Sequence, residues 1–370
     1  MKFTCETAEL NKAVQSVMPA IASKPSTPIF GGMHIIADGE KLRLEGMDIN
    51  LSMSNEIKAV VEEPGEIVIN ASRLNDLARN FNGETVKVTK YENDNNVRLQ
   101  SGKADYKILL MNVNEYPKYP SIEATQSFTL EEEKIKELIK KTSFACSTDN
   151  ARPLFTGVLC EIKDNKITFV GTNTHRLAIR TLDIDNAPEM SVIIPSVVLK
   201  EINKNLNGKL PQEVTFFMVN NQLMVKIENW TVVSRLIEGK FPDYKRVIPP
   251  NFTVKTKVNV KELQGAVSRM SLCSGSENDY SIVKISIKEN EIKVMSSSPD
   301  VGTGEEIISC KTEGSPINVA FNAAYIMDIM KNIETDEAEI NLNNSLSPVC
   351  IKPDSEEEYI YIVTPVRVIF

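Results

Sequence analysis

The chain has 370 residues, 42% hydrophobic and 25% charged, a balance typical of a folded protein of two or three domains rather than a disordered one. Its net charge of −8 excludes a surface that is basic all over, although basic residues could still gather on one face. The six cysteines are scattered without a CxxC pair, the first residues lack a signal peptide's apolar core, and no apolar run of about 18 residues is present, so we expect a cytoplasmic protein without a zinc, redox or membrane site.

A pattern of strand, polar turn and strand recurs every 125 residues along the chain. The three copies are "IFGGMHIIADGEKLRL" from Ile29, "LFTGVLCEIKDNKITF" from Leu154 and "DYSIVKISIKENEIKV" from Asp279. Each copy predicts a β-hairpin. A loop repeats at the same spacing, since "YPKY" at Tyr116 returns as "FPDY" at Phe241. Agreement of separate features at one spacing indicates three copies of one fold.

Each copy also contains two segments with apolar residues at helical spacing. The predicted helices are Glu9–Ala20, Ser72–Asn80, Glu133–Ala145, Val197–Leu206, Lys261–Leu272 and Ala323–Ile333. The strands alternate apolar and polar residues, and a phase slip at Gly46 indicates a bulge or a turn. We therefore predict an α+β fold of three repeated domains, each with two helices packed on antiparallel sheets. The predicted domains are 1–122, 123–250 and 251–370, with short junctions near Ser121–Phe128 and Pro249–Val254.

The charge is unevenly divided between the predicted helices and the remaining chain. The six helices carry a net charge of +5, so the rest must carry −13 to give −8. Lysine and arginine favour helices, which is one explanation. The other is that the helices face an anionic partner, and cations without interleaved aromatic residues suit duplex phosphates better than stacked bases.

Motifs for catalysis are scarce. The sequence has no GxxxxGK[ST] loop, GxGxxG, GxSxG or HExxH motif. "YENDNN" at Tyr91–Asn96 is interpreted as a polar turn rather than a calcium loop, because the Gly and Glu positions of such a loop are missing. The chain has two histidines, His34 and His175, and His175 stands in "TFVGTNTHRLAIRTL". It could be a catalytic base, part of the rim of a pocket, or a surface residue.

Several short motifs on the threefold repeat resemble one family. "MKFT", "KPSTPIFGG", "THRLA", "GKFPDY" and "TPVR" are similar to segments of the bacterial DNA polymerase III β subunits, the sliding clamps. The resemblance implies a head-to-tail homodimer that closes a ring of clamp domains, with helices lining a hole around duplex DNA. It implies a processivity factor without sequence specificity, catalytic residues or cofactors. The implied partners are the polymerase III catalytic subunit, the clamp loader, and other polymerases and repair proteins that bind through short peptide motifs.

The resemblance also implies a peptide-binding pocket. Its predicted residues are Arg152, Phe155, Thr172, Thr174, His175, Arg176, Leu177, Pro242, Arg246, Val247, Leu346, Pro348, Val363, Thr364, Pro365, Val366 and Arg367. The expected apolar floor is Leu177, Val247, Leu346 and Val366, with His175 and Arg176 as a polar rim. Phe155 stands where the family often has leucine and Thr364 where methionine is common, and the chain continues through Val368–Phe370 past the usual end. The other two repeats lack the His-Arg pair, so one pocket per chain is expected.

Two further surfaces follow from the resemblance. Contacts with DNA are expected at Lys24, Arg73, Lys200 and Lys204, whereas Asp149 replaces a polar amide of the family and would repel phosphate. At the dimer interface, Tyr106 and Ile108 are expected to meet Leu272 and Cys273 of a second copy. The alternative that remains is an enzyme in which His175 works with a serine or a carboxylate. Substituting His175 would abolish turnover in an enzyme but only weaken partner affinity in a clamp.

Overall fold

The computed structural model describes residues 1–22, 24–92, 94–120, 125–206, 208, 212–274, 281–355 and 358–368. The chain divides into two compact units, which we call unit 1 (Met1–Glu132 with Glu201–Leu236) and unit 2 (Glu133–Lys200 with Ile237–Phe370). Each unit is built around one antiparallel sheet. Within the described ranges, no helix is both long enough and apolar enough to cross a membrane.

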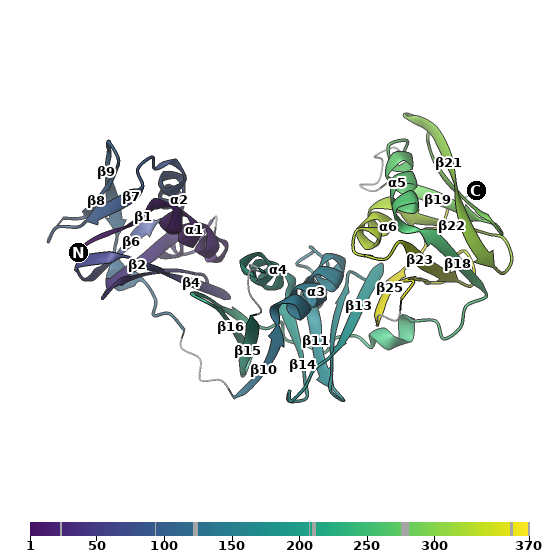
Figure 1. Cartoon of the computed structure of the whole chain (residues 1–370), viewed down its shortest axis with the longest axis horizontal. Coiled ribbons are helices and arrows are strands. Elements are labelled where there is room, and N and C mark those ends of the chain that lie inside the picture. Colours follow the sequence, from purple (N-terminus) through teal and green to yellow (C-terminus); the bar gives the residue numbers. More distant parts are fainter. Residues whose placement is uncertain are drawn as a thin grey trace. The chain divides into compact units, whose positions relative to one another are not determined.

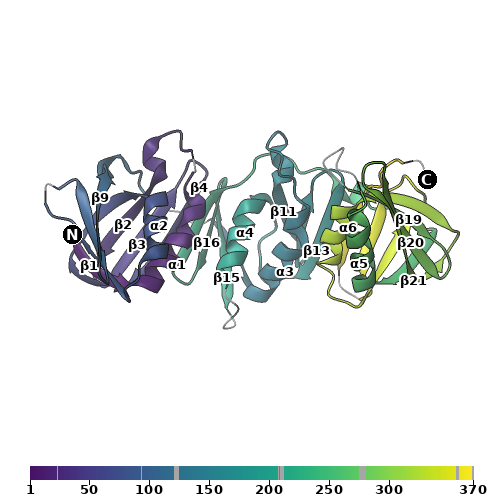
Figure 2. The ribbon, with the colours of Figure 1, turned by 90° about the horizontal axis from the view of Figure 1, so that it is seen from above.

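The sheet of unit 1 joins strands that are far apart in the sequence. In spatial order its described strands are β10 (Gln126–Glu131), β15 (Glu213–Val219), β16 (Gln222–Ile227), β17 (Trp230–Arg235), β4 (Leu51–Lys58), β3 (Lys41–Met47), β2 (Gly32–Asp38), β6 (Gly65–Asn70), β9 (Ala104–Met111), β8 (Asn96–Ser101), β7 (Thr85–Thr89), β1 (Lys2–Glu6) and β5 (Val60–Glu63). Helices α1 (Thr7–Val17) and α2 (Ala71–Asn80) lie side by side on one face of it (Figure 1, Figure 2). The ladder between β17 and β4 makes the sheet continuous, with Trp230 opposite Asn55.

Unit 2 has the same construction. Its described strands are, in spatial order, β14 (Met190–Pro195), β11 (Gly157–Lys163), β12 (Lys166–Thr172), β13 (Arg176–Asp183), β25 (Tyr359–Val363), β24 (Val349–Pro353), β23 (Glu337–Leu342), β18 (Val254–Asn259), β21 (Gly302–Glu313), β20 (Glu291–Ser298), β19 (Ile282–Ile287) and β22 (Ile317–Asn322). Helices α5 (Val260–Ser271) and α6 (Ala323–Met330) pack against each other over its C-terminal strands (Figure 1). The ladder between β13 and β25 joins the two parts of this sheet.

The predicted hairpins are confirmed. They are β2–β3, β11–β12 and β19–β20, each paired in antiparallel register. In the first two, only two residues connect the paired strand ends, and Gly39, Asp164 and Asn165 have the positive φ angles that such tight turns require. The segment at Tyr91–Asn96 connects β7 to β8, as the turn interpretation requires: Asn96 begins β8, and Asn93 lies outside the described residues.

The predicted helices are confirmed to within a few residues. Besides the four above, they include α3 (Glu132–Thr142) and α4 (Ser196–Asn205). Asparagine caps begin α2, α5 and α6, where the side chains of Asn70, Asn259 and Asn322 accept hydrogen bonds from backbone N–H groups one helical turn or less away. The prediction ran past the ends of the first and third helices, because Met18–Ala20 and Ser143–Ala145 tighten into 3₁₀ turns.

The structure differs from the sequence-based expectation at Gly46 and in how the chain divides into compact units. No bulge lies at Gly46, because β3 and β4 pair without a register shift from Lys41 to Met47. A Cβ at Gly46 would approach Val17 and Ile21 side chains to 2.7 Å, so glycine allows close approach of α1 to the sheet. The predicted central domain, 123–250, supplies strands to both sheets, so the compact units follow the ladders instead of the repeats. The three domain boundaries stay a prediction, and the junction residues 121–124 lie outside the described ranges.

A buried ion pair lies inside unit 1. His34 Nδ1 is 3.0 Å from Glu45 Oε2, and its Nε2 is 2.9 Å from Glu66 Oε2. Burial of the ring opposes protonation, but the hydrogen bonds and charges of both carboxylates outweigh it and raise the pKa of His34. The ring contacts ionisable groups from three segments: Glu45 of β3, Glu66 of β6, and Tyr116 after β9. Glu45 is also paired with Arg43, whose guanidinium lies over the Tyr119 ring.

We expect this pair to make unit 1 less stable at alkaline pH. Because the folded pKa of His34 lies above the ordinary 6.5, its stabilisation is fully present below pH 6.5 and is lost as the pH rises through the raised pKa. Urea unfolding followed by fluorescence of Trp230, the single tryptophan and a residue of unit 1, measures the effect. His34→Gln should flatten the pH dependence, with His175→Gln as the control for loss of a histidine. Parallel pH profiles for wild type and His34→Gln would contradict this assignment.

Candidate functional site

A cavity of about 260 Å³ opens in unit 2 beside the turn between β12 and β13. Its lining residues are Phe155, Thr172, Thr174, His175, Arg176, Leu177, Phe241, Pro242, Asp243, Tyr244, Val247, Pro348, Ile362 and Thr364. The predicted central domain and the predicted C-terminal domain both contribute to it. An apolar concave surface with a few polar groups is typical of a binding site.

The turn that carries Thr174 and His175 is closed by its own side chains. Thr174 has a φ of 78°, a left-handed conformation that is uncommon for threonine. The side chain of Asn173 makes this turn possible, because its Oδ1 accepts hydrogen bonds from the N–H groups of His175 (3.1 Å) and Arg176 (3.0 Å). Thr172 Oγ1 donates to the carbonyl of Arg176 at 2.6 Å. The turn therefore has a defined shape without help from a ligand.

Strand β25 forms the second wall. It pairs with β13 from Arg176↔Val363 to Arg180↔Tyr359, and the N–H of Thr364 extends the ladder by donating to the carbonyl of His175 at 2.9 Å. Side chains alternate across a strand. Val363 therefore lies in the core of unit 2, whereas Ile362 lies on the opposite face and lines the cavity.

The remaining walls come from two 3₁₀ turns, Pro153–Thr156 and Tyr244–Val247, from the loop Phe241–Asp243 before the second turn, and from Pro348. The Phe155 and Phe241 rings meet edge to face, with centroids 6.4 Å apart. Leu177 and Ile362 are each 3% exposed and belong to the apolar cluster beneath the cavity, whereas Val247 is 46% exposed at its mouth. An apolar side chain entering here would contact aromatic and aliphatic groups on several sides.

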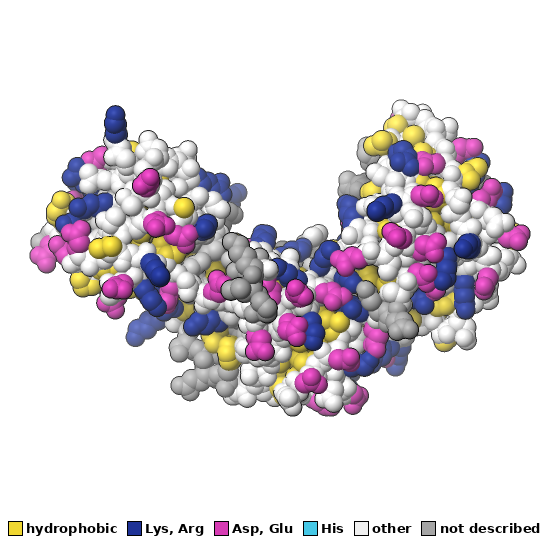
Figure 3. All heavy atoms as spheres, viewed as in Figure 1, with side chains coloured by type: hydrophobic (Ala, Val, Ile, Leu, Met, Phe, Trp, Pro, Cys, Tyr) yellow, Lys and Arg dark blue, Asp and Glu magenta, His cyan; other side chains and the backbone are white. Residues whose placement is uncertain are grey.

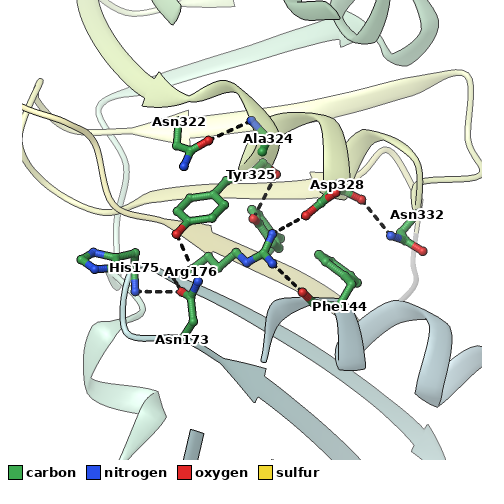
Figure 4. A network of polar contacts seen from close by, with 10 residues as sticks. Phe144, Asn173, His175, Arg176, Asn322, Ala324, Tyr325, Asp328 and Asn332 are labelled. Atoms are coloured by element: carbon green, nitrogen blue, oxygen red, sulfur yellow. Dashed lines mark hydrogen bonds and ion pairs between the residues drawn. The ribbon is translucent and has the colours of Figure 1, made fainter. Parts of the chain in front are cut away.

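The side chains of the neighbouring residues His175 and Arg176 point in different directions (Figure 4). His175 is exposed at the mouth, and its ring has no hydrogen-bond partner among the described residues. The guanidinium of Arg176 extends away from the mouth, to the Phe144 carbonyl and to Asp328, each at 2.5 Å. The expectation that Arg176 is a rim group is therefore wrong, because its charged end is already bound inside the protein.

No catalytic arrangement forms around His175 in the part of the chain that the structure describes. No carboxylate or serine there orients its ring, which a catalytic base requires. Two thiols of the same unit are also unsuited to act as nucleophiles, since burial raises the pKa of Cys146 to about 12 and that of Cys350 to about 11. Among the described residues, no group of three or more His, Cys, Asp or Glu could hold a metal ion.

Part of the predicted pocket lies outside the cavity lining. The predicted residues that do not line it are Arg152, Arg246, Leu346, Val363, Pro365, Val366 and Arg367. Arg246 is ion-paired with Asp243 at 2.9 Å, and Leu346 is 53% exposed on a loop. The N–H of Val366 donates to the Ala320 carbonyl at 2.8 Å, which ties this segment to β22. Of the four residues expected in the floor, Leu177 lies beneath the cavity, Val247 lies at its mouth, and Leu346 and Val366 do not line it. Ile362 and aromatic rings line the cavity as well.

Four lining residues were not predicted: Phe241, Asp243, Tyr244 and Ile362. The first three belong to the repeated "FPDY" loop, from which only Pro242 was predicted, so the repeat was the available signal. Strand alternation would have indicated Ile362 once the position of β25 was known. Burial and the neighbouring Glu161 raise the pKa of Tyr244 to about 12, so it lines the cavity as a neutral phenol.

The predicted DNA contacts are exposed, but they differ in their surroundings. Lys24, Arg73 and Lys200 form no ion pair with any described residue, whereas Lys204 is paired with Glu201 at 2.6 Å. Other cations of the helices are paired as well, as with Lys140 and Glu334 (2.8 Å). The net positive charge of the helices is therefore partly neutralised locally.

The predicted dimer residues lie in two places: Tyr106 and Ile108 on a strand, and Leu272 and Cys273 directly after a helix. Tyr106 and Ile108 are half-buried on β9, whose residues 104–109 pair only with β8 in the described chain. Leu272, at the end of α5, is 77% exposed, and Cys273 is half-buried close to Gly304 of β21. Residues 302–309 of β21 pair only with β20 among the described strands.

Three domain models of one family match successive parts of the chain. They are the DNA polymerase III beta subunit N-terminal domain over residues 1–120, its central domain over 129–243 and its C-terminal domain over 245–367. The chain belongs to the DNA polymerase III beta subunit family. The three-domain clamp fold and the absence of catalysis expected from the sequence are confirmed by this membership.

Curated relatives and solved structures of this family cover the chain almost completely. The beta sliding clamp of Bacillus subtilis strain 168 is 30% identical over 379 residues, covering 99% of this chain and 100% of that protein. The crystal structure of the Bacillus subtilis DNA polymerase sliding clamp has a TM-score of 0.93 at 29% identity, with both chains covered at 100%. A sliding clamp from Bartonella birtlesii bound to griselimycin has a TM-score of 0.93 at 25% identity, again with 100% of each chain covered. The chain is a non-catalytic processivity factor of DNA replication.

We expect Asn173 to be the residue on which the β12–β13 turn depends. Asn173→Ala removes both of the backbone caps and the bond to Tyr325, which should lower the local free energy of opening by about 2 kcal/mol. Asn344→Ala is the matched control, because Asn344 caps two backbone N–H groups in an exposed loop. Native-state hydrogen exchange of the β12 and β13 amides measures the difference. Equal effects of the two substitutions would contradict the special role of Asn173.

Proposed function

We propose that two copies of this chain close head-to-tail around duplex DNA, and that the cavity beside His175 holds partner proteins on the ring by their peptide segments. Family membership supports the partnership with DNA and a DNA polymerase and the dimer. The observation that carries the peptide role is the cavity itself, which is apolar, preformed and open to solvent, on a chain of a non-catalytic family. We place this activity in the cytoplasm, where chromosomal DNA of bacteria is replicated.

The cavity suits a leucine or phenylalanine side chain of an incoming peptide. Leu177, Ile362 and the two phenylalanine rings offer apolar contact, and burial of one such side chain contributes roughly 1.5–3 kcal/mol before ordering costs. His175 and Asp243 remain at the mouth for orientation. We propose as users the polymerase III catalytic subunit, the clamp loader, and other polymerases and repair proteins, one peptide at a time. A relative from Bartonella birtlesii binds griselimycin, which supports ligand binding by clamps of this type.

Closure of the dimer is proposed to pair two open strand edges. The edge of β9 at residues 104–109 and that of β21 at residues 302–309 each have one side without a partner strand in the described chain. An uncovered strand edge promotes pairing with another chain. The exposed Leu272 would then cover Tyr106 and Ile108 of the second copy, and one interface of this kind at each end closes a ring.

Contact with DNA is proposed to be weak and non-specific. Lys24, Arg73 and Lys200 are exposed cations without ion pairs in the described residues, and each would neutralise a phosphate. Acidic and basic side chains lie next to one another on the face seen in Figure 3. Ion pairs such as Arg269–Glu306 also neutralise cations locally. Such a mixed surface gives little net attraction, so retention on DNA would come from enclosure.

We expect a substitution at Val247 to weaken peptide binding, whereas a similar substitution outside the cavity should not. Val247→Asp puts a charge at the apolar mouth and should weaken binding at least tenfold, a change of about 1.4 kcal/mol. Calorimetry with a leucine- and phenylalanine-containing peptide from the polymerase III catalytic subunit measures it. Val60→Asp, which substitutes an exposed valine of unit 1, is the control.

Removing Thr364–Phe370 tests whether the wall formed after β25 is needed for peptide binding. The truncation deletes the bond from Thr364 to the His175 carbonyl and should abolish peptide binding while the dimer stays intact. The same deletion removes residues 369 and 370, which lie outside the described ranges. One site per chain is expected. Three sites per chain, or unchanged affinity after the deletion, would exclude the cavity as the docking site.

We expect Leu272→Asp to open the ring. The residue is 77% exposed, so the chain should fold, but a charge would face Tyr106 and Ile108 of the second copy. Sedimentation should give monomers, and the protein loaded onto nicked circular DNA should be lost at salt concentrations that wild type withstands. Ile49→Asp, at a 63% exposed isoleucine in a turn, should behave like wild type. Equal salt loss of wild type from circular and linear DNA would rule out enclosure.

A further inference from the structure

Arg176 is one of the residues that line the cavity, but its guanidinium is bound to two residues that do not line it. The side chain is 10% exposed, and the guanidinium contacts Asp328 of α6 and the Phe144 carbonyl, which follows α3 (Figure 4). Its Nε is buried without a hydrogen-bond partner in the described structure. A buried guanidinium depends strongly on its remaining partners, because the loss of one leaves its charge uncompensated. The position of Arg176 is therefore tied to that of Asp328.

Helix α6 holds the same turn at a second point. The hydroxyl of Tyr325 accepts a hydrogen bond from Asn173 Nδ2 at 3.1 Å, and its ring lies 4.6 Å from the Arg176 guanidinium. The Tyr325 carbonyl accepts a hydrogen bond from the buried Tyr361 hydroxyl at 3.1 Å, which fixes this tyrosine to β25. Asn173 and Arg176, at the two sides of the turn, are thus both bound to one helix.

The helix itself is well anchored. Asn322 caps its first turn, and its apolar face packs into the core of unit 2 through Ala323, Ile326, Ile329 and Met330. Tyr325 and Asp328 are one helical turn apart, so they present neighbouring contacts to the turn. Neither of them lines the cavity.

We propose that Asp328 and Tyr325 are positioning residues for the peptide site. They act through Arg176 and Asn173 to hold the β12–β13 turn in the shape that receives the peptide, without touching the peptide. The inference rests on the proposed function, namely that the cavity binds peptides. Coupling between two sites is reciprocal, so an occupied cavity steadies α6 as much as α6 steadies the cavity.

The test compares peptide affinity and the dynamics of α6 in the full-length protein. Asp328→Asn should weaken binding of the polymerase-derived peptide about tenfold, within the usual range for coupled sites. Asp328→Glu keeps the negative charge and should retain more of the peptide affinity than Asp328→Asn. Tyr325→Phe keeps the ring but loses the hydrogen bond to Asn173, so its loss of affinity should be smaller than that of Asp328→Asn. The matched control is Asp354→Asn. Asp354 and Asp328 are both ion-paired and have the same 34% side-chain exposure, but Asp354 pairs with Lys257, away from the cavity.

Hydrogen exchange of the α6 amides provides the readout that a merely structural role would not give. Peptide should slow exchange in wild type and in Asp354→Asn, and this protection should be lost in Asp328→Asn. If wild type does not bind the peptide, the proposed function fails. If wild type binds and Asp328→Asn binds equally well, or if both Asn variants lose affinity equally, the positioning role is overturned. If Asp328→Asn does not fold, the same two measurements on Tyr325→Phe, peptide affinity and hydrogen exchange of the α6 amides, test the proposal.

Discussion

The ladder between β13 and β25 is the constraint on which the site depends. It joins a strand of the central domain to the last described strand, in a register that sets Arg176 opposite Val363. That register places the turn at 172–176 beside Thr364 and directs Ile362 to the cavity. A shift by one residue would bring Val363 to the cavity and move Ile362 into the core, because side chains alternate along a strand. The binding surface thus follows from backbone pairing before any side chain is considered.

The polar groups around this ladder divide into those that shape the site and those left for a partner. Arg176 donates hydrogen bonds to Asn173 from its backbone N–H and to Asp328 from its guanidinium, and this network fixes the turn (Figure 4). His175 has no such partner in the described residues and stays exposed at the mouth. A clamp needs a preformed place for an apolar anchor and no reacting group, and this division of roles provides it.

Much of the fold could be predicted from local patterns, whereas the site could be predicted only in part. Hairpins and helices depend on residues close in sequence, such as Asp164 and Asn165 in a tight turn or Asn322 before α6. The pocket depends on residues from distant segments, so the choice between Ile362 and Val363 could not be made without the partner strand. Likewise the charge of Arg176 was assigned to the rim because nothing near it in the sequence indicates Asp328, 152 positions away.

The threefold repeat, the hairpins, the six predicted helices and the family could be recognised from the amino-acid sequence, because periodicity, turn residues and motifs are local properties. Other features depend on the tertiary structure: where strand ladders join one repeat to the next, which face of β25 lines the cavity, and which charged side chains are paired within the protein. It also brought His34 between Glu45 and Glu66, from two other strands. These features arise from pairing between segments separated by tens to hundreds of residues, and their geometry exists only after the chain has folded.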